Sequence, residues 1–144
     1  EYRRQRQMCI RDRYKRGVFA LDTALFLHDL TDRTPHKFHM AFPYGYNTSS
    51  PKAAGILCSC KKEPYYSLGI ALVDTPAGNT VRAYNAEKTL CEILKPISHT
   101  DIQIITDAFK RYAGRKDKNI PLLSEYAHQL RVEKRLRPYL EVLL

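Results

Sequence analysis

The chain has 144 residues, a formal net charge of +9 and 44% hydrophobic residues, a composition typical of a soluble globular protein. Its length predicts one domain that folds without metal or disulfide staples. We find no signal peptide, only four scattered cysteines, and no apolar run near the roughly 18 residues of a membrane span, so we expect a reducing, cytoplasmic setting. The positive charge favours an acidic partner, such as nucleic acid or an acidic protein surface.

The first thirteen residues differ from the rest of the chain. Residues 8–13 read Met-Cys-Ile-Arg-Asp-Arg, which is what a transposase adapter used for sequencing libraries encodes in one reading frame. We therefore expect residues 1–13 to be non-native, adapter-derived sequence, and one domain to span residues 14–144. A basic arm that binds nucleic acid is the alternative for this segment.

Alternating apolar residues predict strands in the N-terminal half. Phe38, Met40 and Phe42 share one face of the stretch 37–42, as in a strand with one side on the core. Further strands are expected at residues 17–20, 56–62, 65–73 and 80–84. The last two should form an antiparallel hairpin through the turn 74–79.

Other segments of this half predict helix and loop. The nearly all-apolar stretch Leu21–Leu30 predicts a buried helix, in which His28 is expected to be a hydrogen-bonded core residue. The stretch 44–51 is predicted to be a loop. Cys58 and Cys60 share one face of their strand, but no second pair of cysteines or histidines completes four ligands for zinc. We interpret them as core residues and expect no metal site.

The pattern changes from strand to helix at Asn85. Residues 80–84 alternate as a strand, and apolar residues recur at helical spacing within residues 86–95. The Asn85 side chain is expected to cap the helix, and Glu87 places negative charge near the positive end of the helix dipole. We interpret both residues as structural.

Helical patterns fill the remainder of the chain. Thr100 and Gln103 have the spacing of a capping box, and Gly114 is expected to end that helix in the left-handed conformation. Pro121 should start the next helix, and Pro138 is predicted to interrupt the last. The sequence thus predicts an α+β fold, with a small antiparallel or mixed sheet in the N-terminal half packed against a C-terminal bundle of helices.

The chain shows no constellation typical of catalysis. It has no phosphate-binding loop, no dinucleotide fingerprint and no zinc-protease motif, and no acidic residue is followed two positions later by lysine, as in many Mg²⁺-dependent nucleases. We therefore predict that the protein is not an enzyme and needs no cofactor.

A basic block near the C-terminus is the better candidate for function. It contains nine basic residues against the acidic Asp117, Glu125 and Glu133. The basic residues are Lys110, Arg111, Arg115, Lys116, Lys118, Arg131, Lys134, Arg135 and Arg137. If their helices pack as neighbours, they form one positive face for an acidic partner or for nucleic acid. A solvated surface whose cations favour helix C-termini is the alternative.

Seven ordered stretches of the chain resemble one known family. They are residues 16–28, 31–35 (Thr-Asp-Arg-Thr-Pro), 46–49 (Tyr-Asn-Thr-Ser), 79–82 (Asn-Thr-Val-Arg), 101–103, 110–119 and 132–144. Together they resemble the C-terminal domain of the AbiEi-type antitoxins of abortive-infection toxin–antitoxin systems, over about 130 residues. The resemblance implies a partner toxin of the nucleotidyltransferase kind, encoded alongside, in a system that limits phage spread by arresting the infected cell.

Two departures from the family pattern stand out. Members usually carry an N-terminal winged helix-turn-helix that binds their promoter, and this sequence has no counterpart of it, so we expect no promoter binding by that route. Where the family often has Glu-Arg-Thr and then an aspartate, this chain has Glu87, Lys88, Thr89 and Glu92. These changes keep the charges but alter the geometry of a bidentate contact.

The main hypothesis is therefore an antitoxin domain that antagonises its toxin, directly or through the toxin's target. The alternative is a transcriptional regulator that binds nucleic acid through the basic block. A degenerate nuclease is a third interpretation.

Overall fold

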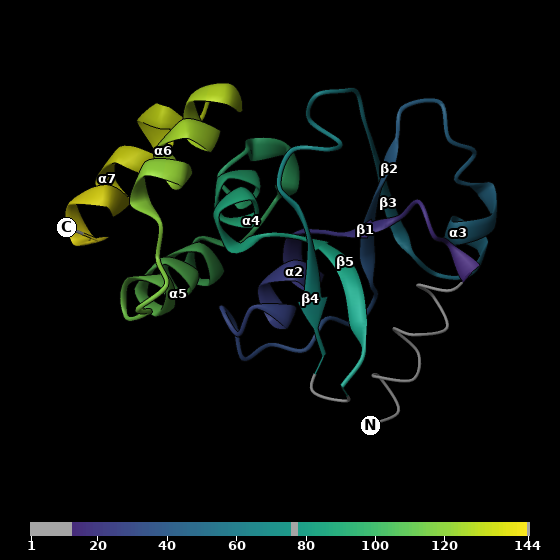
Figure 1. Ribbon diagram of the computed structural model, residues 1–144, viewed down its shortest axis with the longest axis horizontal. Coiled ribbons are helices and arrows are strands. Elements are labelled where there is room, and N and C mark those ends of the chain that lie inside the picture. The colour runs from purple at the N-terminus through teal and green to yellow at the C-terminus, as the bar shows by residue number, and fades with distance from the viewer. Residues whose placement is uncertain (1–12, 76–77, 144) are drawn as a thin grey trace.

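The structure, a computed structural model, describes residues 13–75 and 78–143. Its fold is α+β, as the sequence predicts: the N-terminal half forms a mixed sheet, and helices dominate the C-terminal half (Figure 1). Residues 1–12 of the expected adapter-derived segment lie outside the described residues, as do Pro76 and Ala77 in the expected hairpin turn. No helix in the described part of the chain is long and apolar enough to cross a membrane.

The sheet has five strands in the order β3-β2-β1-β5-β4. Their bounds are Val18–Phe19 for β1, His39–Pro43 for β2, Leu57–Lys61 for β3, Ile70–Asp74 for β4 and Thr80–Tyr84 for β5. Strand β1 pairs antiparallel with β2 and parallel with β5. Strand β3 pairs parallel with β2, whereas β4 and β5 form the expected antiparallel hairpin.

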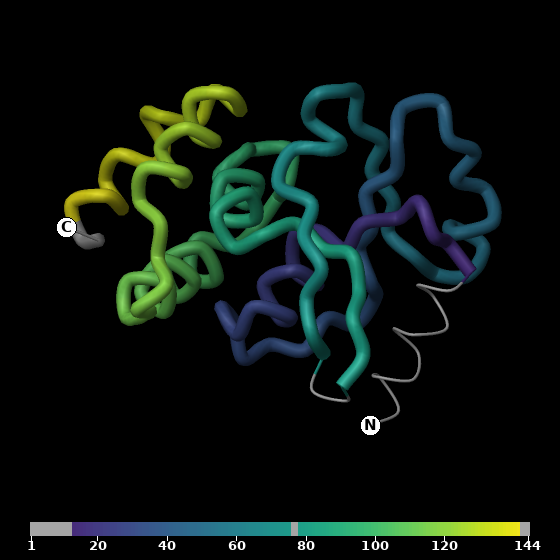
Figure 2. The backbone as a smooth tube through the Cα atoms, viewed as in Figure 1, coloured from purple at the N-terminus to yellow at the C-terminus, as the bar shows by residue number. Residues whose placement is uncertain are grey.

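The helices lie mainly to one side of this sheet (Figure 1). Their bounds are Leu21–Leu27 for α2, Ser49–Ala53 for α3, Ala86–Ile93 for α4, Ile102–Ala113 for α5, Ile120–Gln129 for α6 and Glu133–Leu143 for α7, with the 3₁₀ turn η1 at Pro96–Ser98. The backbone tube shows α4 in the middle of the molecule, between the sheet and α5, α6 and α7 (Figure 2). The helical core includes Leu25, Leu90, Phe109, Leu123 and Leu136, so one apolar cluster joins α2 to the C-terminal helices.

Helix α4 begins as the sequence predicts. The Asn85 side chain accepts a hydrogen bond from the Lys88 backbone N–H at 2.8 Å, which satisfies one of the free amides of the first turn. Glu87 lies in that turn, but it is buried and accepts a hydrogen bond from the Tyr112 hydroxyl at 2.6 Å. Glu87 therefore links α4 to α5, in addition to interacting favourably with the positive end of the helix dipole. All eight residues of α4 are buried.

The predicted caps of α5 are wrong at both ends, although the helix does end at Gly114 as the sequence predicts. Asp101 caps the helix, because its carboxylate accepts the Gln103 backbone N–H at 2.8 Å, while the Thr100 hydroxyl lies 3.0 Å from the Ser98 hydroxyl. A charged cap beside the positive helix end is stronger than a hydroxyl cap, so the expected box between Thr100 and Gln103 does not form. Gly114 keeps right-handed helical dihedrals, with φ of −80°, and does not take the left-handed conformation.

Other predicted boundaries are also wrong. Helix α3 begins at Ser49, within the predicted loop 44–51. Pro51 does not prevent this helix, because it lies in the first turn, where a backbone N–H would have no partner within the helix. Helix α2 ends at Leu27, and Asp29 then takes the left-handed conformation, with φ of 57°. Helix α7 continues through Pro138, held by the buried Leu136 on one side and by Tyr139, which stacks on α5, on the other.

Candidate functional site

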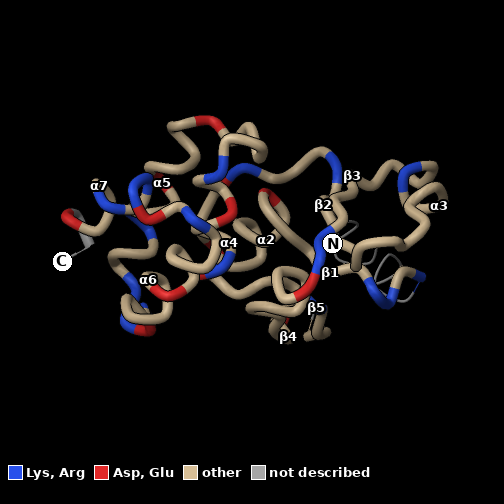
Figure 3. Tube along the Cα trace, turned by 90° about the horizontal axis from the view of Figure 1, so that it is seen from above, with Lys and Arg blue, Asp and Glu red and all other residues tan. Residues whose placement is uncertain are grey.

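The nine basic residues of the C-terminal block lie in two groups, one near each end of α6. Lys110, Arg111, Arg115, Lys116 and Lys118 surround the end of α5, and Arg131, Lys134, Arg135 and Arg137 surround the start of α7. Ten helical residues rise about 15 Å, which separates the groups along the α6 axis. Helices α5 and α7 do pack as neighbours, through the stacked rings of Phe109 and Tyr139 at 4.4 Å. Figure 3 shows acidic residues interspersed among the basic ones on these elements.

Arg115 of the first group holds the fold together. Its Nε and one terminal nitrogen donate to the Asp117 carboxylate, both at 2.8 Å, and its other nitrogen donates to the His28 carbonyl at 3.0 Å. The bidentate pair raises the pKa of Arg115 and lowers the pKa of Asp117. The arginine thus ties the α5–α6 connection to the end of α2, and it is not a free cation for a partner.

Arg111 is also paired within the chain. Its Nε lies 2.9 Å from the Asp107 carboxylate on the same helix, and a terminal nitrogen lies 3.9 Å from the carboxylate of Asp32. The second contact joins α5 to the segment that follows α2. Lys110 and Lys116 are exposed, so they remain the members of the first group best placed for an external partner.

Three members of the second group line an open groove at the α6–α7 turn, whereas Arg137 lies outside it. The groove encloses about 590 Å³ and is lined by His128, Arg131, Glu133, Lys134 and Arg135. His128 Nδ1 lies 2.9 Å from the Glu133 carboxylate, so part of the local negative charge is already engaged. Three permanent cations around one hollow are suited to an anionic group, such as a phosphate or an acidic side chain.

A second hollow lies between α2, the segment after it and α5. This cleft of about 440 Å³ is lined by Asp22, Leu25, Thr31, Arg33, Thr34, Pro35, His36 and Ile104. The Thr31 hydroxyl accepts the Arg33 backbone N–H at 3.2 Å, which shapes the rim. Ile104, which is partly exposed, contributes apolar surface to the cleft, whereas Leu25 is fully buried. The cleft can therefore receive both apolar and charged side chains of a partner, and sequence reasoning did not single it out.

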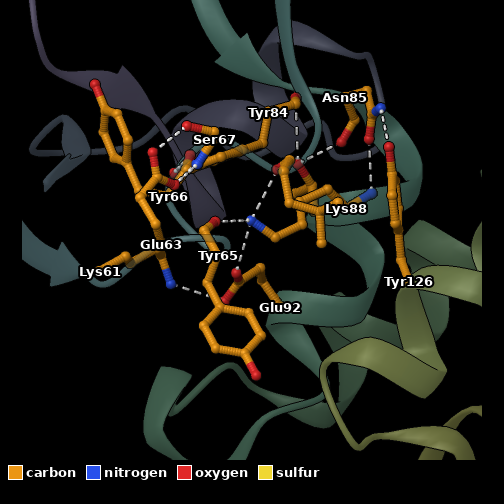
Figure 4. A network of polar contacts seen from close by, with 12 residues as sticks. Lys61, Glu63, Tyr65, Tyr66, Ser67, Tyr84, Asn85, Lys88, Glu92 and Tyr126 are labelled. Atoms are coloured by element: carbon orange, nitrogen blue, oxygen red, sulfur yellow. Dashed lines mark hydrogen bonds and ion pairs between the residues drawn. The ribbon is translucent and has the colours of Figure 1, made fainter.

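The least expected feature is a buried lysine in α4. The Lys88 side chain is 0% exposed, and its Nζ donates to the carbonyls of Tyr65 at 3.0 Å and Leu68 at 3.1 Å (Figure 4). The same nitrogen lies 3.2 Å from the Glu92 carboxylate and 3.8 Å from the centre of the Tyr84 ring. Lysines are almost never fully buried unless paired, and this one has carbonyl, carboxylate and aromatic partners.

Glu92 is the second member of this network. One carboxylate oxygen faces Lys88, and the other accepts a hydrogen bond from Lys61 Nζ at 3.1 Å, so the carboxylate lies between two ammonium groups (Figure 4). Burial lowers the pKa of Lys88 to about 8, although Glu92 opposes the fall. Burial also raises the pKa of Glu92, but attraction to Lys61 and Lys88 outweighs it, and that pKa lies below its usual value. The carboxylate is therefore ionised at neutral pH.

His28 and Cys58 each have a hydrogen-bond partner within the chain. His28 Nε2 lies 2.8 Å from the Tyr84 carbonyl, which confirms a hydrogen-bonded histidine, and burial lowers its pKa. The Cys58 thiol donates to the Ile56 carbonyl at 3.5 Å, and Cys60 is exposed rather than in the core. Within residues 13–75 and 78–143, no three His, Cys, Asp or Glu side chains gather closely enough to hold a metal ion.

Comparison with known proteins adds no assignment. No model of a known protein family matches the chain, and no curated protein sequence matches it either.

Proposed function

We propose that this chain is an antitoxin domain that antagonises a nucleotidyltransferase-like toxin encoded beside it, acting by binding in the cytoplasm without a cofactor. The observation that carries the proposal is that stretches resembling AbiEi-type antitoxins, far apart in sequence, contact one another in space. Arg115 donates to the His28 carbonyl, and Arg111 lies 3.9 Å from Asp32. The resemblance therefore involves one packed unit rather than unrelated surface segments.

Two substitutions in α4 relative to the family pattern support the proposal in a second way. The family often has arginine and aspartate where this chain has Lys88 and Glu92, and these two side chains face each other at 3.2 Å. Lysine in place of arginine loses a bidentate fork, whereas glutamate in place of aspartate extends the acid by one methylene. The two changes affect one ion pair, as expected of substitutions that compensate for each other.

We place the toxin contact at the cleft between α2 and α5. Two of the resembling stretches, 16–28 and 31–35, line it directly, and Ile104 follows a third, residues 101–103. Its exposed Arg33 and Asp22 offer charges of both signs beside apolar surface, which is suited to a protein partner.

Growth rescue tests this proposal. In a host arrested by the cognate toxin, co-expression of the chain is expected to restore colony formation. Arg33→Glu should abolish rescue, because it reverses the charge at the cleft. The matched control is Lys52→Glu, the same charge reversal on the exposed surface of α3, at the other end of the molecule (Figure 1). Control cells should grow as well as cells with the unchanged chain.

The same strains distinguish a failure of antitoxin function from a failure of direct contact with the toxin. Absence of rescue by the folded, unchanged chain contradicts antitoxin function. Rescue without capture of the toxin by the tagged chain contradicts direct contact at the cleft and assigns the antagonism to the toxin's target.

The groove at the α6–α7 turn favours a second candidate, a regulator that binds nucleic acid. If Lys134 and Arg135 neutralise phosphates, the double change to alanine should reduce the slope of log affinity against log salt by about two. Fluorescence anisotropy with a labelled duplex between about 50 and 200 mM salt measures that slope. Alanine at Lys37 and Lys52, two exposed lysines outside the basic block, is the control and should leave the slope unchanged. No binding of the unchanged chain at low salt rejects this candidate.

A further inference from the structure

Strand β4 forms an open edge of the sheet. Among the described residues, β5 is its only paired strand, and Figure 3 places both strands at the margin of the molecule. The opposite edge strand, β3, ends at Lys61 and is followed by Lys62, and helix α3 packs against it. Lysines and covering helices are common devices that prevent one edge strand from pairing with another.

Within the described residues, the exposed edge of β4 has neither kind of protection. Its residues 70–73 read Ile-Ala-Leu-Val, with no charge and no proline, and the Leu72 side chain is 73% exposed. Asp74, at the end of the strand, is its only charged residue. An apolar, uncovered edge of this kind is a template for strand pairing.

The hydrogen bonds at both ends of the hairpin show which backbone groups face outward. At one end the Gly69 carbonyl accepts from Asn85 N–H at 2.8 Å, and at the other Thr75 N–H donates to the Asn79 carbonyl at 2.7 Å. Residues in an antiparallel pair face their partner strand alternately. Every second residue from position 69 to position 75 therefore faces β5.

The residues between them face away from β5. Leu72 directs both its N–H and its C=O to the open edge, Asp74 directs its N–H there, and Ile70 its C=O. Ile70 N–H is already used, because it donates to the Ser67 carbonyl at 3.4 Å. The outward-facing donors and acceptors of the edge are therefore matched on either side of Leu72: the Asp74 N–H on one side and the Ile70 C=O on the other.

We propose that β4 pairs antiparallel with β4 of a second copy of this chain, about a two-fold axis at Leu72. Each Leu72 then donates to and accepts from the Leu72 of the other copy, and each Asp74 N–H donates to the Ile70 carbonyl opposite. The pairing joins two five-stranded sheets into one continuous sheet and brings the exposed Leu72 side chains together. It does not depend on the proposed antitoxin function.

Charge permits this approach although the chain carries +9. The paired segment itself is neutral except for Asp74. The two Asp74 residues would lie four positions apart across the pair, about 14 Å at 3.4 Å per residue, beyond the roughly 8 Å screening length at physiological salt. Contact through one short strand buries less than the roughly 1,200 Å² of a stable interface, so the dimer is reversible and depends on concentration.

Sedimentation velocity across a range of concentrations tests the proposal. The unchanged chain is expected to shift from monomer towards dimer as concentration rises, and Leu72→Lys should remain monomeric because it places two ammonium groups side by side on the axis. The matched control is Ile102→Lys, which replaces a side chain 64% exposed on α5 and should dimerise as the unchanged chain does.

Amide hydrogen exchange of the unchanged chain gives an independent measurement that needs no variant. The amides of Leu72 and Asp74 should exchange rapidly in dilute solution and slow as concentration rises, whereas those of Ala71 and Val73 should be protected throughout by β5. A chain that stays monomeric at high concentration, or that dimerises while the Leu72 amide remains unprotected, overturns the proposal.

Discussion

Replacing Lys88 with methionine is expected to lower the free energy of unfolding by about 3 kcal/mol, the magnitude of removing one partner from a buried ion pair. The carbonyls of Tyr65 and Leu68 lose the Lys88 donor, and Glu92 keeps only Lys61. Methionine fills most of the volume, so the loss comes from polar groups rather than from a cavity. Urea denaturation at pH 7 measures the change. Lys61→Met is the control and should destabilise less, since Lys61 is partly exposed.

The pH dependence of this difference provides a second check. The pKa of Lys88 is about 8 in the folded state and about 10.4 in an unfolded chain. Between these values the unfolded state binds more protons, so Lys88 makes stability rise with pH in that window. Other groups act oppositely: burial raises the pKa of Cys91 to about 12 and also raises the pKa of Tyr84. Their contributions are common to both proteins and cancel in the comparison.

The gap between the unchanged chain and Lys88→Met should therefore widen from pH 8 to pH 10. A gap that stays constant over this range would show that Lys88 titrates at the same pH in both states, and the burial argument would fail.

Local patterns in the sequence were sufficient to predict several elements. Met40 and Phe42 of β2 share a core cluster with Phe38, which precedes the strand, although Ala41 on the other face is buried as well. Asn85 caps α4 because it lies where strand spacing gives way to helix spacing. Both features depend on neighbours within a few residues. The strand order was not accessible in this way, because Phe19 pairs with Ala83 across a long intervening segment that carries no local signal for it.

The candidate sites were predicted less well, for a physical reason. A cluster of cations in sequence indicates charge but not its partners, so Arg115 was grouped with surface cations although it ties α2 to the α5–α6 connection. The burial of Lys88 was not predicted, since it depends on carbonyls supplied by a distant loop. Its spacing of four residues from Glu92 was the only local signal.

Gly69→Ala is the second change with a large expected effect, about 3 kcal/mol of lost stability. Gly69 has φ of 82°, and a Cβ there would lie 2.8 Å from Lys88 Cβ and 3.1 Å from Lys88 Cγ. Lys88 cannot move aside, because its backbone belongs to α4 and its Nζ is held by two carbonyls. The left-handed backbone and the overpacking each contribute about 1 to 3 kcal/mol.

A second glycine separates these two contributions. Gly55 has φ of 86°, but a Cβ there meets nothing within 4 Å, so Gly55→Ala should lose only the backbone part, about 1 kcal/mol. Thermal and urea denaturation of both variants measure the difference. Equal losses would mean that the approach of Gly69 to Lys88 contributes nothing. A larger loss at Gly69 shows instead that the loop before β4 can pack over the buried Lys88 only because Gly69 has no side chain. The position of the edge strand β4 then depends on the Lys88–Glu92 pair of α4.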